Sequence, residues 1–239
     1  MPVSIRVTKI HHACLTIDDG STRILLDPGK FGPRPGLDGV DAVLITHRHV
    51  DHLDPDLVAE ALRRGVPVWA PGDALGDIGV PDGIEDGGPH EAVPGAALRI
   101  GSLSVQVAGE RHAELHPTLP GPENRAYLID ERVLVTGDEH PVPPSRPTTL
   151  VTPIDAPWLR ATDLIRYVRD VHPELVVGVH DGLLNADGLS VARHVIDSLR
   201  DEGATRATML SDGVASQGAD ARVTDLATLM LEAVRRGGE

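Results

Sequence analysis

The sequence has very few aromatic residues and only one cysteine. Phenylalanine, tyrosine and tryptophan make up 2% of its 239 residues, so the core has to be built from valine, leucine, isoleucine and alanine. The same scarcity argues against aromatic platforms that stack on bases or sugars. Cys14 has no second cysteine to pair with, which excludes an intramolecular disulfide and a cluster of thiolate metal ligands.

Long hydrophobic runs and an excess of positive charge are also missing. The first ten residues alternate in polarity and lack the apolar stretch of a secretory leader, and no later stretch approaches the length of a membrane span. The formal net charge of −14 opposes attraction to nucleic acid and to anionic membranes. We therefore expect a cytoplasmic protein with a small-molecule substrate and with neither a nucleic-acid nor a membrane partner. Whether it forms homo-oligomers is left open.

The order of apolar segments predicts a layered α/β fold. Short strands fill the first third of the chain, with a hairpin turn at Asp19-Gly20, and later strands alternate with helical segments. This order indicates two sheets sandwiched by helices in a single domain over residues 1–239. The expected strands are 3–9, 13–18, 22–27, 42–46, 66–70, 98–100, 103–108, 126–129, 133–136, 149–153 and 175–179, and the expected helices are 55–64, 162–171, 189–202 and 223–236. We expect residues 71–95 to be irregular and the proline-rich loop 141–147 to separate two similar halves.

Histidine is abundant, and four potential metal ligands fall within six positions. The segment THRHVDH, residues 46–52, contains His47, His49, Asp51 and His52 between an expected buried strand and an expected helix. Neutral imidazoles and a carboxylate suit zinc and neighbouring divalent metals. The alternative is a solvated polar loop, but no similar density of ligands recurs beside most other apolar strands. We favour a metal site.

These four residues match the HxHxDH signature of the metallo-β-lactamase superfamily in full, and the chain resembles that superfamily. The wider context is similar too, with Asp27-Pro28-Gly29 after an early strand, Gly137-Asp138 after a later one and His180 after another. The resemblance implies a four-layer αββα sandwich of the metallo-β-lactamase type, with such strand ends along one edge. It is greatest to small cytoplasmic hydrolases related to sugar-phosphate lactonases and phosphodiesterases.

The resemblance also implies a dinuclear site with seven ligands. One metal ion would be held by His47, His49 and His112, the other by Asp51, His52 and His180, and Asp138 would bridge the two. A hydroxide between the metals would attack the substrate, and Asp51 would orient it as a catalytic residue. Zinc is the expected metal, although nitrogen and oxygen ligands also accept manganese, iron or nickel.

Several residues near these ligands keep two interpretations. His116 lies in the same expected loop as His112, and we favour His112 because it is nearer to the strand end. Asp27 is expected to form a turn or to orient a ligand. His12 would either approach the site or pack as a strand histidine, and the role of His140 is left open.

The expected function is hydrolysis of an ester, a lactone or a phosphate ester. An RNA-processing or nucleotide phosphodiesterase of the same superfamily is an alternative, but the acidic charge and the few aromatic residues weaken it. An alternative from a different class of protein is a metal-stabilised interaction module that has no turnover.

Overall fold

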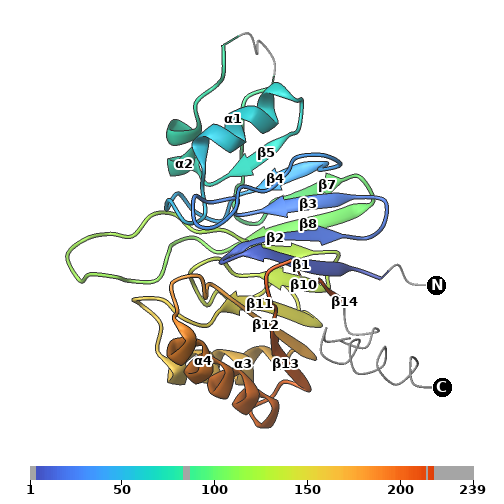
Figure 1. Ribbon diagram of the computed structural model, residues 1–239. Helices are drawn as coiled ribbons and strands as arrows, with labels where there is room; N and C mark the ends of the chain where they lie inside the picture. The colour runs from blue at the N-terminus through green and yellow to red at the C-terminus, as the bar shows by residue number, and fades with distance from the viewer. Residues whose placement is uncertain (1–3, 83–86, 214, 218–239) are drawn as a thin grey trace, which may run out of the picture.

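The computed structural model describes residues 4–82, 87–213 and 215–217, and it contains two seven-stranded sheets packed face to face (Figure 1). The first sheet consists, from edge to edge, of β14 (Ala215–Gln217), β1 (Arg6–His11), β2 (Cys14–Asp18), β3 (Arg23–Leu26), β4 (Ala42–Leu44), β5 (Val68–Ala70) and β6 (His90–Glu91). The second consists of β13 (Arg206–Met209), β12 (Leu175–Val179), β11 (Thr149–Pro153), β10 (Val133–Val135), β9 (Ala126–Ile129), β8 (Leu103–Ala108) and β7 (Ala97–Ile100).

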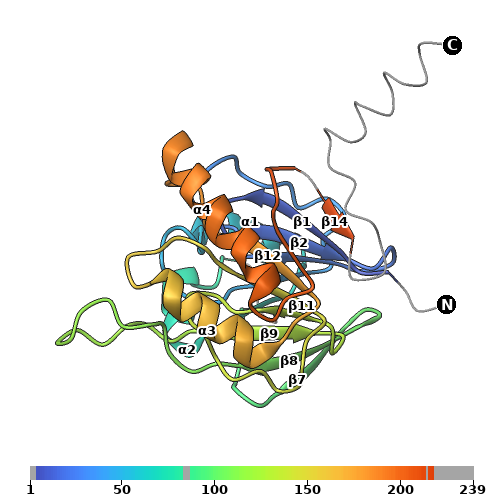
Figure 2. The ribbon, with the colours of Figure 1, turned by 90° about the horizontal axis from the view of Figure 1, so that it is seen from below.

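Helices cover the outer face of each sheet. The first sheet is covered by α1 (Pro55–Arg63) and α2 (Gly72–Ile78), and the second by α3 (Ala161–Val171) and α4 (Ala186–Ser198), which continues into the 3-10 turn η1 (Leu199–Asp201) (Figures 1 and 2). This is the predicted αββα sandwich. Within the described part of the chain, each helix falls short of the length and apolar character that a membrane span requires.

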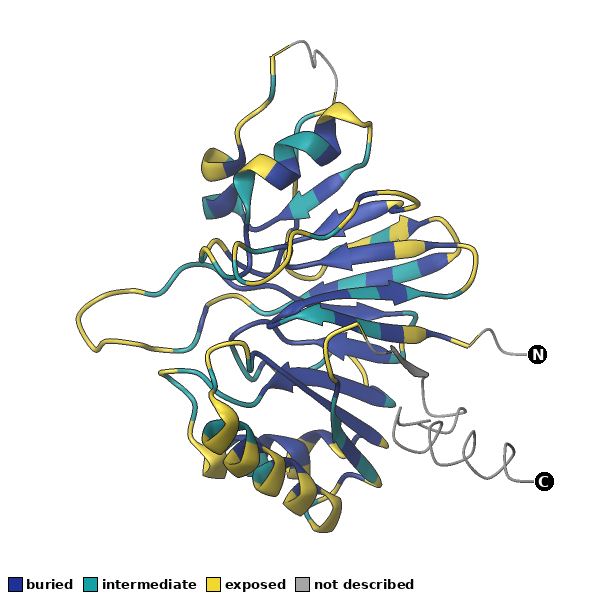
Figure 3. Cartoon of the chain, in the orientation of Figure 1, coloured by how far each residue is buried: buried dark blue, intermediate teal, exposed yellow. Residues whose placement is uncertain are grey.

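Three apolar layers hold the four structural layers together. Strand β4 shows how, because Ala42 and Leu44 face the second sheet while Val43 packs toward α1. In the second sheet, Val177 belongs to the layer between the sheets and Val176 packs under α3 and α4. Strands that are buried on both faces have to be apolar at every position, which explains the continuous apolar runs in the sequence (Figure 3).

The direction of the strands gathers the loops that carry the predicted ligands. Strands β1 and β3 run the same way because both are antiparallel to β2, and β4 is parallel to β3. In the second sheet, β8 and β10 run the same way because both are antiparallel to β9, and β11 and β12 are parallel to β10. Their carboxyl ends therefore lie together at one edge of each sheet. Backbone hydrogen bonds join the two edges, from the His180 N–H to the His12 carbonyl at 3.0 Å and from the Arg125 N–H to the Thr46 carbonyl at 2.8 Å.

The expected strands are all present, with shifts of one to three residues at several ends. Helix α4 begins at Ala186, three residues earlier than expected, because the Asn185 side chain accepts the Gly188 N–H and caps it. The expected helix 223–236 lies outside the described residues.

Two expectations about organisation were wrong, and two strands were missed. Residues 71–95 are not wholly irregular, since they contain α2 and the two-residue edge strand β6. The edge strands β13 and β14 were not expected. The loop 141–147 does not separate two halves, because β10 and β11 on either side of it are neighbours in one sheet. The chain passes from one sheet to the other between β6 and β7.

Candidate metal centre

The seven predicted ligands come together between the two sheet edges. Three groups of side chains have their ligand atoms within 4.8 Å of one another: His47, His49 and His112; His47, His52 and Asp138; and His12, Asp51, His52 and His180. These residues come from the loops after five strands, β1, β4, β8, β10 and β12. The fold therefore gathers the seven side chains, and it brings His12 to the same place.

The HxHxDH segment is shaped by the chain around it. The Thr46 N–H donates to Asp27 Oδ1 at 2.7 Å, which fixes the end of β4. The His52 N–H then folds back onto the His49 carbonyl at 2.9 Å. Gly29 lies directly against this turn, where a Cβ atom would be 2.0 Å from the Asp51 carbonyl oxygen. Close packing thus requires the glycine of Asp-Pro-Gly, because only glycine leaves room for the Asp51 backbone.

Hydrogen bonds fix the ring orientation of four of the histidines. His112 Nδ1 lies 2.6 Å from the Ala113 carbonyl, and His180 Nδ1 lies 2.6 Å from the Asp155 carbonyl. A carbonyl only accepts, so each Nδ1 carries the proton and donates it. In a neutral ring this leaves Nε2 with a bare lone pair, which is the arrangement of a metal-ligating histidine.

Asp27 orients the other two. His52 Nδ1 lies 2.8 Å from Asp27 Oδ2, and His47 Nδ1 lies 3.1 Å from Thr46 Oγ1. The Thr46 hydroxyl in turn donates to Asp27 Oδ2 at 2.7 Å. One buried carboxylate therefore sets the ring orientation of both histidines, in agreement with the expectation that Asp27 orients ligands.

The atoms that face the middle of the cluster have no hydrogen-bond partner among the described residues. They are His47 Nε2, His52 Nε2, His180 Nε2 and Asp138 Oδ1, all buried. Zinc bonds of about 2.0 to 2.1 Å in a tetrahedral arrangement place neighbouring ligand atoms about 3.3 to 3.4 Å apart. His180 Nε2 is 3.3 Å from both Asp51 Oδ2 and Asp138 Oδ2. The residues present therefore fit a divalent metal ion in chemistry and in spacing.

Asp138 lies between the two proposed sites. Its Oδ1 is 3.4 Å from His52 Nε2, and its Oδ2 is 3.4 Å from His112 Nε2. Its backbone N–H donates to Asn124 Oδ1 at 3.0 Å, and the Asn124 amide donates to the Thr136 carbonyl at 2.9 Å. A carboxylate that faces histidines of both groups has the position of a bridging ligand.

Trp158 is a site residue that sequence reasoning missed. Its indole N–H donates to Asp138 Oδ2 at 3.2 Å, and its ring lies edge-on to His112 with centroids 6.3 Å apart. The scarcity of aromatic residues had argued against platforms that stack on bases or sugars, and no aromatic residue had been considered for the metal site. The sequence offered one sign of this role: Trp158 is one of only two tryptophans and follows the expected strand 149–153 by a few residues.

Burial and neighbouring charges together shift the pKa values of the metal-free centre. Burial lowers the pKa of His180, but the carboxylates of Asp138 and Asp51 outweigh it and raise the pKa to about 9. Burial and the neighbouring His52 hold the pKa of His47 well below its usual value. Burial raises the pKa of Asp138, but the surrounding histidines outweigh it and the pKa is well below normal. A proton and a metal ion therefore compete for Nε2 of His180.

Two other histidines lie away from this cluster. His116 is exposed in the arm of residues 111–123 that projects from the left of Figure 1, and it bonds locally to Thr118. The geometry thus places His112, and not His116, with the other ligands. His140 stacks on Tyr167 with ring centroids 4.4 Å apart, and burial lowers its pKa to about 4.

The fold and this cluster define an αββα protein with a histidine and aspartate metal centre. A family model described as the β-lactamase superfamily domain matches residues 6–180, a range that includes all seven predicted ligands. The chain belongs to this family, and its fold is that of the metallo-β-lactamase superfamily.

Individual relatives support the same placement. The chain is 31% identical over 196 residues to Protein Rv0786c of Mycobacterium tuberculosis, covering 78% of this chain and 89% of that protein. It is 32% identical over 146 residues to the UPF0173 metal-dependent hydrolase MJ1163 of Methanocaldococcus jannaschii, covering 55% and 60%. The crystal structure of the metallo-β-lactamase fold protein YhfI from Bacillus subtilis superposes with a TM-score of 0.65 at 16% identity, covering 90% of this chain and 100% of that chain.

Proposed function

We propose that this chain is a dinuclear hydrolase of small esters, lactones or phosphate esters. At the coarser level, the chain is a metal-dependent hydrolase of the metallo-β-lactamase superfamily. The finer proposal assigns one metal ion to His47, His49 and His112 and the other to Asp51, His52 and His180, with Asp138 shared. A single domain over residues 1–239, zinc as the native metal and a cytoplasmic location stay predictions.

The observation that carries the proposal is that the Nε2 atoms of His47, His52 and His180 are buried without a hydrogen-bond partner among the described residues. Leaving a buried polar atom without a partner costs about 1 to 3 kcal/mol. When the rings are neutral, three imidazole nitrogens and one carboxylate oxygen are left so here, because the carboxylates 3.3 to 3.4 Å away accept a hydrogen bond only from a protonated ring. Hydrogen bonds on the far side of the rings aim these nitrogens inward. A pair of divalent cations, one in each proposed site, satisfies all of them, and an apolar ligand satisfies none.

The residues of the chain divide the work of hydrolysis between them. When bound, a pair of divalent ions lowers the pKa of water toward neutrality and polarises the substrate oxygen. Asp51 is only partly buried and has a carboxylate facing the centre, so it accepts a hydrogen bond from an attacking water and orients it. Trp158 helps to hold Asp138 in place by donating a hydrogen bond to its Oδ2.

A cavity beside the first proposed site supports a small-molecule substrate. It has a volume of about 460 Å³ and is lined by Arg48, His49, Val50, Asp73 and residues 120–122. The Arg48 guanidinium is already paired with Asp77 at 2.8 Å, so it does not supply a free positive charge for a nucleic-acid backbone. This arrangement favours a compact ester over a polymer.

The ligand assignment is tested by comparing His112→Ala with His116→Ala. Elemental analysis of the wild-type chain should give two metal ions, and His112→Ala should lose one because alanine removes one of three imidazoles. His116→Ala should keep both and serves as the matched control, since it removes an imidazole from the same arm. One metal ion in the wild-type chain, or loss of a metal in the His116 variant alone, contradicts the assignment.

The reaction class is tested on a panel of carboxylic esters, lactones and phosphodiesters. Hydrolysis should disappear on chelation and return when metal is added, because the metal ions supply the chemistry. Turnover confined to RNA or nucleotide phosphodiesters would select the alternative within the superfamily. A chain that binds two metal ions and turns over no member of a broad panel would favour the interaction module.

A further inference from the structure

His12 differs from the four histidines described above in the hydrogen bonds that its ring makes. It is 1% exposed, lies in the turn between β1 and β2, and has a backbone φ of 52°. Its Nε2 is 3.3 Å from Asp51 Oδ2, so by distance alone it qualifies as a ligand of the second metal ion together with Asp51, His52 and His180. Its other ring nitrogen shows that it has a different role.

The Gly182 backbone N–H donates to His12 Nδ1 at 3.0 Å. A backbone amide nitrogen only donates, so His12 Nδ1 carries a lone pair and no proton. A neutral imidazole then has its proton on Nε2, and this N–H points at Asp51 Oδ2. In His112 and His180 the polarity is reversed, because Nδ1 donates to a carbonyl and Nε2 is bare.

We propose that His12 is a positioning residue, which donates a hydrogen bond to the carboxylate of Asp51 and does not bind metal. The inference rests on the proposed function, in which Asp51 is a ligand of the second metal ion. A ligand role for His12 would require a bare Nε2 and a proton on Nδ1. That proton would face the Gly182 N–H across 3.0 Å, so two donors would oppose each other inside the protein.

The donor at Gly182 is held in place from both sides. The His180 N–H donates to the His12 carbonyl at 3.0 Å, which ties the two turns together. Gly182 lies directly against both histidines, since a Cβ atom there would be 3.0 Å from His12 Nδ1 and 2.9 Å from His11 Nε2.

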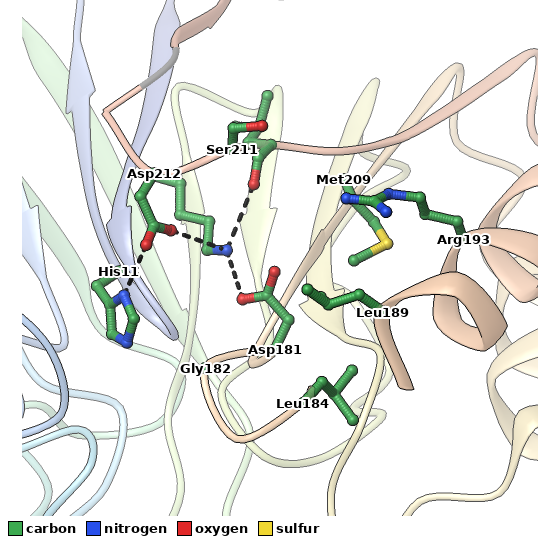
Figure 4. Close-up of a pocket in the computed structure, with 11 residues that line it drawn as sticks. His11, Asp181, Gly182, Leu184, Leu189, Arg193, Met209, Ser211 and Asp212 are labelled. Carbon is green, nitrogen blue, oxygen red and sulfur yellow. Dashed lines mark hydrogen bonds and ion pairs between the residues drawn. The ribbon is translucent and has the colours of Figure 1, made fainter. Parts of the chain in front are cut away.

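The residue between His180 and Gly182 anchors the same turn. Asp181 pairs with the buried ammonium of Lys9, which also contacts Asp212 Oδ1 at 3.2 Å and the Leu210 carbonyl at 3.3 Å (Figure 4). The ring polarity of His12 is therefore imposed by a rigid segment. It does not depend on whether metal is bound.

Two substitutions separate the two ends of the His12 ring. In His12→Asn, the amide oxygen can still accept the Gly182 N–H, but the side chain is too short to reach Asp51, and asparagine tolerates a positive φ. In His12→Gln, the amide nitrogen reaches the position of Nε2 and can donate to Asp51, but the acceptor for Gly182 is lost. If His12 serves folding alone, His12→Asn should be the variant closer to the wild type, because it keeps the acceptor for Gly182. If His12 positions Asp51, His12→Gln should be closer to the wild type in metal affinity.

The readout is metal affinity, measured by competition with a chromophoric chelator. We expect both variants to bind two metal ions at saturation. The weaker of the two affinities should fall about 10- to 100-fold in His12→Asn, the usual loss when a group that orients a ligand is removed, and change less than about threefold in His12→Gln. His11→Ala, which removes the adjacent imidazole that bonds to Asp212 instead, is the matched control and should keep wild-type affinity. Loss of one metal ion from both variants at saturation would overturn the proposal. Equal metal affinities in His12→Asn and His12→Gln would overturn it as well.

A measurement on the wild-type chain decides the matter without any variant. In protein labelled with nitrogen-15 and loaded with cadmium-113, scalar coupling to the metal should appear on the rings of His52 and His180 and be absent from His12. The His12 spectrum should show a protonated Nε2 with and without cadmium. Coupling to His12 in a chain that holds two cadmium ions overturns this assignment alone. A chain that binds no cadmium overturns the proposed function instead.

Discussion

Two clusters of charged side chains, the metal centre and a group around the buried Lys9 ammonium, lie next to each other at the same end of the molecule, and they differ in how their polar atoms are satisfied. In the Lys9 cluster, formed by Lys9, His11, Asp181 and Asp212, the ammonium contacts two carboxylates and a carbonyl. In the metal centre, three imidazole nitrogens point at the middle and have no partner among the described residues.

The boundary between the clusters runs between consecutive residues of one loop. His180 faces the metal centre, whereas Asp181 turns to Lys9. Each cluster contains a buried charged group, Lys9 in one and Asp138 in the other, so a buried charge does not by itself identify a functional site. What separates them is unmet bonding capacity, because a paired cluster stabilises the fold by itself and an unpaired one needs a ligand.

The largest expected effect comes from removing the carboxylate that faces histidines of both proposed sites. Asp138→Ala should lower kcat/KM at least about a thousandfold and reduce the bound metal below two ions, because several kcal/mol of stabilisation by the metals are lost. Asp212→Asn in the Lys9 cluster is the control and should stay near wild-type kcat/KM. Steady-state kinetics beside elemental analysis checks both. Equal losses in the two variants would erase the distinction between the clusters.

Chelation should act on the metal centre alone and lower the Tm by about 10 °C. At free metal about a thousandfold above Kd, bound metal contributes about 4 kcal/mol, and each kcal/mol shifts the Tm of a domain of this size by about 2 to 4 °C. Differential scanning calorimetry of verified metal-free protein measures the shift. An unchanged Tm would mean that the bare nitrogens do not bind metal strongly.

Rising pH should destabilise the metal-free form over an interval in which the metal-bound form keeps its stability. The pKa of His180 in the metal-free fold is about 9, above the ordinary 6.5, so its proton stabilises the fold below pH 6.5 and this stability is lost as the pH rises to about 9. Metal binding displaces that proton, so metal affinity should rise over the same interval. The Tm gap between the two forms should therefore widen between pH 6.5 and 9. Parallel curves would contradict the competition between proton and metal at His180.

Removing the cation of the Lys9 cluster should affect stability without affecting metal content. Lys9→Met leaves the carboxylate of Asp181 without its buried partner, and breaking such a pair costs about 3 kcal/mol. Urea unfolding of the metal-free variant should show this loss, while the native variant should still bind two metal ions. Loss of metal with unchanged stability would reverse the roles given to the two clusters.

The sequence predicted the metal centre better than its surroundings. His47, His49, Asp51 and His52 are close in the chain and follow an apolar strand, so their convergence could be read locally. His112, Asp138 and His180 were placed by resemblance, because sequence spacing does not show which loops meet. The geometry brings all of these together, although their binding of metal stays a prediction.

The features that were missed depend on contacts between distant segments. The ring polarity of His12 is set by an amide 170 residues away, and no local pattern encodes it. The edge strand β13 is short and half-buried, so it lacks the apolar run that marked the central strands. The prediction put the boundary between the two halves at the proline-rich loop 141–147. Such a loop interrupts the regular secondary structure, but the strands on either side of it still pair in one sheet.

The smallest expected effect concerns Trp158, which touches the metal centre through one hydrogen bond. Trp158→Phe keeps an aromatic ring but removes the N–H that donates to Asp138 Oδ2 at 3.2 Å. Because this side chain is only half-buried, the loss should lie near the low end for a bond to a charged group, about 1.4 kcal/mol or tenfold in kcat/KM, with both metal ions retained.

Trp69→Phe provides the matched control, because Trp69 lies in β5 and packs against His90 away from the centre. It also leaves Trp158 as the only tryptophan, so its fluorescence should change as metal is added to the metal-free protein. The emission of Trp69 in the Trp158→Phe variant should not respond. A response from Trp69, or wild-type kcat/KM in Trp158→Phe, would show that the indole bond does not help to hold Asp138 and would place Trp158 among the groups that only pack around the centre.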